Sequence, residues 1–249
     1  MTPRHDTAKH ARNEHNEAPL EVLTERRRVK DAPTRLAHGL LAVSFLTVYL
    51  TSDSEKLRLL HVTMGYLMLG LLAFRLLYGI AGPRYARLQS LWTKVVTFAQ
   101  WLRLSLHQLS RVTSPQPINW TQGRVLVTPA LTAVMLALIA PIALSGYLTF
   151  NSFGGDWGED LFGEVHELLS NSLLFAVSGH LSWLLVSSVI TKRNEAAQMW
   201  SGLVRGKGPD LVQHNRVWLA VCVALAAMTY ICWEWSQSPR GLISWSALF

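Results

Sequence analysis

The chain has 249 residues, of which 50% are hydrophobic and 16% charged, and ten are tryptophans. This composition predicts an integral membrane protein, because the apolar residues are grouped into blocks. The net charge of +7 does not indicate nucleic-acid binding, since the lysines and arginines lie between the apolar blocks and not on one face. We therefore expect a lipid membrane as the surroundings and no nucleic-acid partner.

The N-terminal segment, residues 1–28, is polar and basic and has few large apolar side chains. Such a segment cannot bury enough apolar surface to fold, so it predicts a disordered tail. It also lacks the apolar core of a secretory signal peptide. The first apolar span, Pro33–Leu50, follows and carries His38 near its start.

The second apolar span, Leu57–Ile80, carries His61 near its start. A different pattern follows near 90–112, where apolar residues at helical spacing alternate with lysine and arginine. This pattern predicts an amphipathic helix that lies on the membrane surface. The third span is Val125–Phe150, whose two internal prolines are tolerated where neighbouring helices cover the freed carbonyl groups.

A loop is expected over Asn151–Gly163, ahead of the fourth span, Gly163–Ile190. This fourth span carries His166 and His180. A polar, basic link then leads to a fifth apolar span, Val217–Trp235, which contains no histidine. We therefore predict an all-α integral membrane bundle with five transmembrane helices.

The basic residues predict the orientation of these helices. Lysine and arginine are concentrated in the N-terminal segment and in the links 81–124 and 191–216, whereas Asn151–Glu164 has acidic residues and no basic one. Because basic residues are retained in the cytoplasm, the N-terminus is expected there and the C-terminus in the periplasm. The expected location is the bacterial cytoplasmic (inner) membrane.

The two histidines of the fourth span are the strongest functional signal. A separation of 14 residues places His166 and His180 about 40° apart around a helix and about 21 Å apart along it. A bilayer core is about 30 Å thick, so one imidazole would lie near each membrane surface. Depth then pairs His61 with His166 on the outer side and His38 with His180 on the inner side.

Two facing neutral imidazoles can fill both axial positions of a haem iron, and two such pairs would form an electron path across a membrane. Glycines beside these histidines, Gly39, Gly65 and Gly179, would leave room for a flat macrocycle. Alternatively, such glycines serve helix packing and a lone histidine makes an interhelical hydrogen bond. The chain has no C-x-x-C-H motif, which excludes covalent c-type haem.

Three segments carry a resemblance to a known family: VKDAPTRLAHGLLAVSFL, LLHVTMGYLMLGLLAFRLLYGIAGPRYARL and VHELLSNSLLFAVSGHLSWLLVSSVI. Together they resemble the prokaryotic cytochrome b-561 and nickel-hydrogenase cytochrome b family over about residues 29–205. The resemblance implies a four-helix core that binds two b-type haems, with four residues at the positions of the metal ligands: His38, His61, His166 and His180. Residues 206–249 would then add a linker, the fifth transmembrane helix and a short outer tail.

Three functions are compatible with these features. The first is electron transfer between the quinone pool and a redox protein outside the cytoplasm, such as a cytochrome c, a hydrogenase or a dehydrogenase, with quinone or quinol as an exchangeable substrate. The second is a self-contained quinone-coupled oxidoreductase such as a superoxide oxidase. The third is a haem-free transporter with a proton relay, which would usually show internal repeats. The features favour an electron-transfer subunit over a stand-alone enzyme.

A cluster of acidic residues precedes His166 and contains no lysine or arginine: Asp156, Glu159, Asp160 and Glu164. An acidic rim beside the outer site would steer a basic redox partner. Alternatively, the cluster reflects only the retention of basic residues inside and the preference of acids for a helix start.

Overall fold

The computed structural model describes residues 26–109, 118–206 and 208–238, except for the side chains of Leu109 and Arg205. Two short strands are present, β1 (Arg26–Arg28) and β2 (Leu203–Arg205). Seven α-helices lie in the described residues: α2 (Ala32–Leu50), α3 (Arg58–Ala81), α4 (Leu88–Leu109), α5 (Trp120–Phe150), α6 (Gly155–Thr191), α7 (Ala197–Ser201) and α8 (Val217–Gln237). Two 3-10 turns, η1 (Glu55–Leu57) and η2 (Arg84–Ala86), flank α3.

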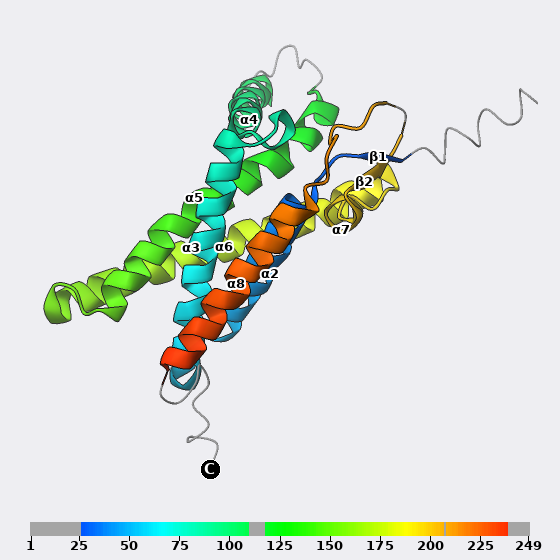
Figure 1. Ribbon diagram of the computed structural model, residues 1–249. Coiled ribbons are helices and arrows are strands. Elements are labelled where there is room, and N and C mark those ends of the chain that lie inside the picture. The colour runs from blue at the N-terminus through cyan, green and yellow to red at the C-terminus, as the bar shows by residue number, and fades with distance from the viewer. Residues whose placement is uncertain (1–25, 110–117, 207, 239–249) are drawn as a thin grey trace, which may run out of the picture.

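Five helices, α2, α3, α5, α6 and α8, run between two ends of the molecule (Figure 1). The helices α5 and α6 pack against each other, α2 packs on α3 and α8, and α3 joins the two groups through α5. One end holds the turns between α2 and α3 and between α5 and α6. The opposite end holds α4, α7 and the two strands (Figure 1). We call these the turn end and the strand end.

Four segments are long and apolar enough to cross a membrane: Glu55–Ala81, Trp120–Phe150, Gly155–Thr191 and Val217–Gln237. The protein is thus an all-helical bundle of the multi-pass membrane type. Helix α2 is not among the four, because its first two turns carry Pro33, Arg35 and His38. The total of five transmembrane helices therefore stays a prediction.

The two strands connect distant parts of the chain at the strand end. They pair antiparallel, with Arg26 opposite Arg205 and Arg28 opposite Leu203. The residues preceding α2 and the link after α6 therefore lie at the same end of the bundle. The tail predicted for residues 1–28 lies outside the described residues apart from its last three, which form β1.

The loop predicted over Asn151–Gly163 is wrong from Gly155 onward, because α6 begins there. Gly154 has a φ of 86°, a left-handed conformation that favours glycine, and it makes the sharp reversal out of α5. The polar residues that suggested a loop are exposed in the first turns of α6. The helix is therefore 37 residues long and extends well before His166.

An apolar cluster fills the middle of the bundle. Met68 and Leu72 of α3, Ile139 of α5 and Leu173 of α6 are buried against one another. Leu173 lies seven residues from both His166 and His180. The cluster therefore separates the two levels at which the histidines of α6 lie.

A buried carboxylate organises the strand end. Asp31 is 0% exposed and caps α2 by accepting a hydrogen bond from the Thr34 N–H at 3.3 Å. Its other carboxylate oxygen accepts hydrogen bonds from the hydroxyls of Tyr78 and Tyr85, the latter at 2.8 Å. Burial and then the hydrogen bond to Asp31 raise the pKa of Tyr85, so its hydroxyl remains a donor. This network holds the start of α2 against the end of α3.

We expect Asp31→Ala to lower the thermal stability of the protein. The change removes the helix cap, worth about 1 kcal/mol. It also takes the acceptor from two tyrosine hydroxyls, at about 1–3 kcal/mol for the buried hydroxyl of Tyr78. Thermal unfolding in detergent, followed by size-exclusion chromatography, measures the midpoint. Asp160→Ala is the matched control, since Asp160 is exposed on α6. Equal midpoints for the two variants would contradict the structural role of Asp31.

Candidate functional site

Two histidines from different helices lie close together near the turn end. His61 lies in the first turn of α3, and its Nδ1 is 2.9 Å from the carbonyl oxygen of Val48 in α2. His166 of α6 has its Nδ1 at 3.0 Å from the carbonyl oxygen of Ile142 in α5. A carbonyl can only accept a hydrogen bond, so each Nδ1 carries the proton. The lone pair of each ring is therefore on Nε2.

The separation of these two rings suits a shared metal. The centroids of the His61 and His166 rings lie 6.2 Å apart, with an angle of 64° between the ring planes. A metal–imidazole bond is about 2 Å long, and the ring centre lies about 1 Å behind the bonding nitrogen, so two axial rings on one metal have centroids about 6 Å apart. The hydrogen bonds at Nδ1 fix both rings in the way that second-shell carbonyls orient metal-ligating histidines.

The space around these rings is large enough for a cofactor. A cavity of about 660 Å³ is lined by both histidines and by residues of α2, α3, α5 and α6. Cofactor pockets typically measure about 300–1,000 Å³. Met68, Ile139 and Leu173 of the central cluster line it on the inner side, and a Cβ added at Gly65 would meet no atom within 4 Å. A flat macrocycle between the imidazoles fits this site.

The other two histidines lie toward the strand end. His180 follows His166 on α6 by 14 residues, and it lies within electrostatic reach of His38 on α2. The Nδ1 of His180 is buried and has no hydrogen-bond partner in the described part of the chain. A Cβ added at Gly39 or Gly179 would meet open space. An imidazole nitrogen without a partner, beside open space, also fits a bound group. In contrast to His61 and His166, the ring of His180 has no hydrogen bond at Nδ1 that fixes its orientation.

Positive charge gathers near this inner site. Lys30 lies just before α2, and its pKa is lowered by burial and, secondarily, by the nearby cations Lys94 and Arg75. Arg75 donates a hydrogen bond to the carbonyl oxygen of Ala86 at 3.0 Å. The positive side chains on this side would compensate the negative charge of a cofactor with carboxylate groups.

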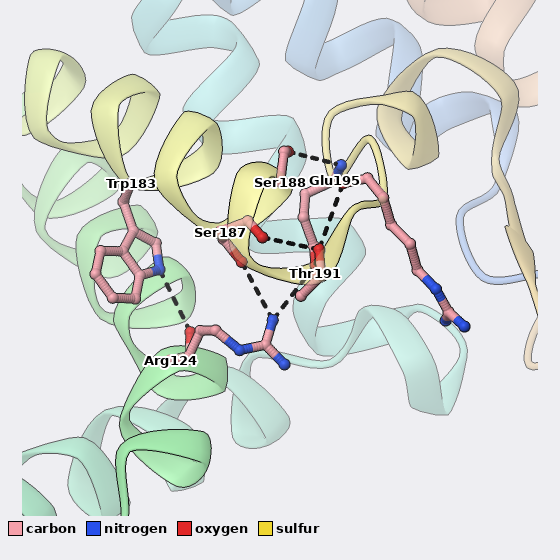
Figure 2. Close-up of polar contacts among 7 residues, drawn as sticks. Arg124, Trp183, Ser187, Ser188, Thr191 and Glu195 are labelled. Carbon is pink, nitrogen blue, oxygen red and sulfur yellow. Dashed lines mark hydrogen bonds and ion pairs between the residues drawn. The ribbon is translucent and has the colours of Figure 1, made fainter.

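An arginine clamps α5 to α6 on the strand-end side of His180 (Figure 2). The Nη1 atom of Arg124 donates to the Ser187 hydroxyl at 3.2 Å and lies 3.6 Å from the Glu195 carboxylate. The Trp183 indole donates to the Arg124 carbonyl at 3.3 Å. Ser187 is seven residues, or two turns, beyond His180 on the same face of α6. The clamp therefore holds in place the half of α6 that carries His180.

No group of three or more His, Cys, Asp or Glu side chains suitable for a metal ion occurs in the described residues. A haem needs only two axial ligands from the protein, so one pair of histidines would be enough to hold it. The model of the family described as prokaryotic cytochrome b561 matches residues 29–202 of the chain. The chain belongs to the prokaryotic cytochrome b561 family. No curated protein and no solved structure matches it.

Membership of the cytochrome b561 family indicates a membrane protein that binds haem b and transfers electrons through it. The match includes all four histidines and the helices α2, α3, α5 and α6. It ends before α8, so the C-terminal apolar helix lies outside the matched residues.

Gly146 of α5 lies against the ring of His166, although the sequence patterns did not single it out. A Cβ added there would lie 2.9 Å from Cε1 and 3.0 Å from Nδ1 of His166. Only glycine lets α5 approach the imidazole this closely. A glycine 20 residues before a histidine is too common in membrane helices to be a signal.

We expect Gly146→Ala to loosen a haem held by His61 and His166. The added methyl group forces the His166 ring to move and weakens its hydrogen bond to Ile142, at about 1–3 kcal/mol for overpacking. About 1.4 kcal/mol corresponds to a tenfold change in affinity. Haem loss to a haem-scavenging protein, followed by absorbance, measures the effect. Gly70→Ala is the control, because a Cβ there meets open space, and equal loss rates would contradict the role of Gly146.

Proposed function

We propose that the protein carries electrons across the bacterial inner membrane through two non-covalent b haems. His61 and His166 would hold the outer haem, and His38 and His180 the inner one. The observation that carries the proposal is the outer pair, in which the rings of two histidines from different helices have centroids 6.2 Å apart and both Nδ1 atoms lie at hydrogen-bond distance from carbonyl oxygens. A histidine that served only helix packing would not need a facing partner beside a large cavity.

When bound, each haem supplies one iron that cycles between the ferric and ferrous states. The protein contributes orientation and exclusion of water. The Val48 and Ile142 carbonyls set the direction in which the outer imidazoles present Nε2. The buried cluster of Met68, Leu72, Ile139 and Leu173 keeps the space between the two levels apolar. This arrangement favours electron movement between the sites over movement of ions.

The proposed orientation has the strand end in the cytoplasm and the turn end in the periplasm. The pairing of β1 with β2 supports it, because the basic residues that precede α2 and the basic link after α6 then share one end of the bundle. The helix α2 would cross the membrane with the other four, which would place the C-terminus in the periplasm. Quinone is the proposed electron donor or acceptor within the membrane.

The proposed partner at the turn end is a soluble redox protein, such as a cytochrome c, a hydrogenase or a dehydrogenase. Four acidic residues are exposed on the first turns of α6: Asp156, Glu159, Asp160 and Glu164. The hydroxyl of Ser152 donates a hydrogen bond to the Glu159 carboxylate at 3.0 Å. An exposed acidic surface near His166 supports attraction of a basic partner. Electron exchange that is independent of ionic strength in the native pair would exclude this mode of docking.

Haem content tests the proposal directly. We expect the purified protein, produced with sufficient haem, to contain two haems b per chain in a pyridine haemochrome assay. The reason is that four imidazoles supply two pairs of axial ligands. One haem or none per chain would contradict the proposal, and a spectrum without haem would favour the transporter alternative. Superoxide oxidation without a protein partner would favour the self-contained oxidoreductase.

A further inference from the structure

Arg58 lies at the mouth of the outer cavity. It is the first residue of α3, one turn before His61, and it lines the cavity together with both outer histidines. The other formally charged residues in the cavity lining are Asp53, Glu55 and Glu167, all acidic. Among the described residues that line the cavity, Arg58 is therefore the one lysine or arginine.

The present contacts of Arg58 leave it available to a ligand. Its Nη1 lies 3.7 Å from the Glu55 carboxylate, and the two side chains are 51% and 89% exposed. Such an exposed ion pair is weak and readily exchanged. The guanidinium also lies over the Phe150 ring, 5.4 Å from its centroid. This cation–π contact with α5 keeps the group beside the cavity while its hydrogen-bond donors stay free to rearrange.

A haem b carries two carboxylates, and these need a partner at an otherwise acidic mouth. An ionised carboxylate placed near Asp53, Glu55 and Glu167 without a cation would be disfavoured by repulsion and desolvation. Arginine offers a planar fork of donors that matches a carboxylate. We propose that Arg58 binds a carboxylate of the outer haem, exchanging its contact with Glu55 for this one. The proposal rests on the two-haem function above and assigns the anchor that sets how the outer haem is held.

The test measures haem loss from the purified two-haem protein to a haem-scavenging protein in excess. Hydrogen bonds to charged groups contribute about 1.5–3 kcal/mol, so Arg58→Gln should release the outer haem about tenfold faster or more. Arg58→Lys should give an intermediate rate, because lysine keeps the charge and loses the fork. The inner haem is an internal control, and its rate of loss should not change.

Lys56→Gln is the matched control for charge. Lys56 lies in the same turn, two residues from Arg58, and is not among the residues that line the cavity. The variant removes the same charge from the turn end, so a general electrostatic effect would appear in both variants. We expect the outer haem of Lys56→Gln to dissociate at the wild-type rate.

A second measurement asks whether the carboxylates themselves are recognised. Haem-depleted protein is loaded with haem b or with its dimethyl ester, in which both carboxylates are blocked. The ester should leave the outer site of the wild-type protein as fast as haem b leaves Arg58→Gln. Substituting Arg58 should then have no further effect on the ester.

Two outcomes would overturn the assignment of Arg58. Equal loss of haem b from the wild type and Arg58→Gln would do so, and so would an effect of the substitution that persists with the ester. Both outcomes require a wild-type protein that holds two haems. A wild type without haem would instead contradict the proposed function, so the two failures are distinguishable.

Discussion

His166→Ala should remove the outer haem and leave the inner haem bound. The alanine takes away one of two axial ligands, and the facing His61 would be left alone beside a cavity of about 660 Å³. The inner pair contains His180, which is 14 residues and about 21 Å further along α6 than His166. The inner haem site should therefore persist. We expect one haem per chain by pyridine haemochrome and loss of one component from the redox titration.

The matched control is His214→Ala, because His214 is exposed in the link before α8. That variant should keep both haems. Free imidazole added during haem loading should partly restore the outer haem of His166→Ala, since the ligand can enter the space that the side chain leaves. Two haems in His166→Ala would contradict the assignment of the outer site, and a loss of both would show that the two sites are not independent.

The positions of the four histidines could be predicted from the sequence because they follow from helical geometry. A separation of 14 residues brings two side chains back to one face, and the alternating direction of the helices then sets their depth. The structure brings His61 and His166 together and places His38 near His180. Their role as haem ligands stays a proposal.

The groups that orient these histidines could not be predicted. The acceptors for His61 and His166 are the backbone carbonyls of Val48 and Ile142, and every residue has such a carbonyl. The same limit applies to Gly146, whose contact with His166 depends on how closely α5 approaches α6. Arg124 is an isolated cation at the start of an apolar span. Glu195, with which it forms an ion pair, is 71 residues away in the sequence. Such contacts depend on packing, which residue spacing does not encode.

The remaining differences arise at helix ends. The acidic residues after Gly155 suggested a loop, but carboxylates also favour the first turns of a helix, where the dipole is positive. The sequence gives no signal for β1 and β2, because a three-residue strand is stabilised mainly by its partner and not by its own composition. Helix α2 is correctly located, while its polar start leaves its crossing of the membrane as a prediction.

His180→Ala should stop electrons from crossing the membrane while the outer haem remains bound. The imidazole belongs to the inner pair, and without that site an electron at the outer site would face an apolar gap of about 21 Å along α6. Electron tunnelling declines steeply with distance, so one haem cannot replace two. The experiment uses liposomes that contain the protein and trapped ferricyanide, with an impermeant reductant outside. The wild type should reduce the ferricyanide, and the variant should not exceed protein-free liposomes.

Phe175→Ala is the control on the same helix, because Phe175 is 81% exposed on α6 and is not among the residues that line the cavity at His61 and His166. It should support crossing at the wild-type rate. A spectrum of the liposomes establishes that His180→Ala still holds one haem, which separates a broken path from an unfolded protein. If His180→Ala, with one haem bound, transfers electrons across the membrane at the wild-type rate, the inner histidine pair is not on the electron path. Because trapped acceptor and external donor can be exchanged, the same variant tests both directions of flow.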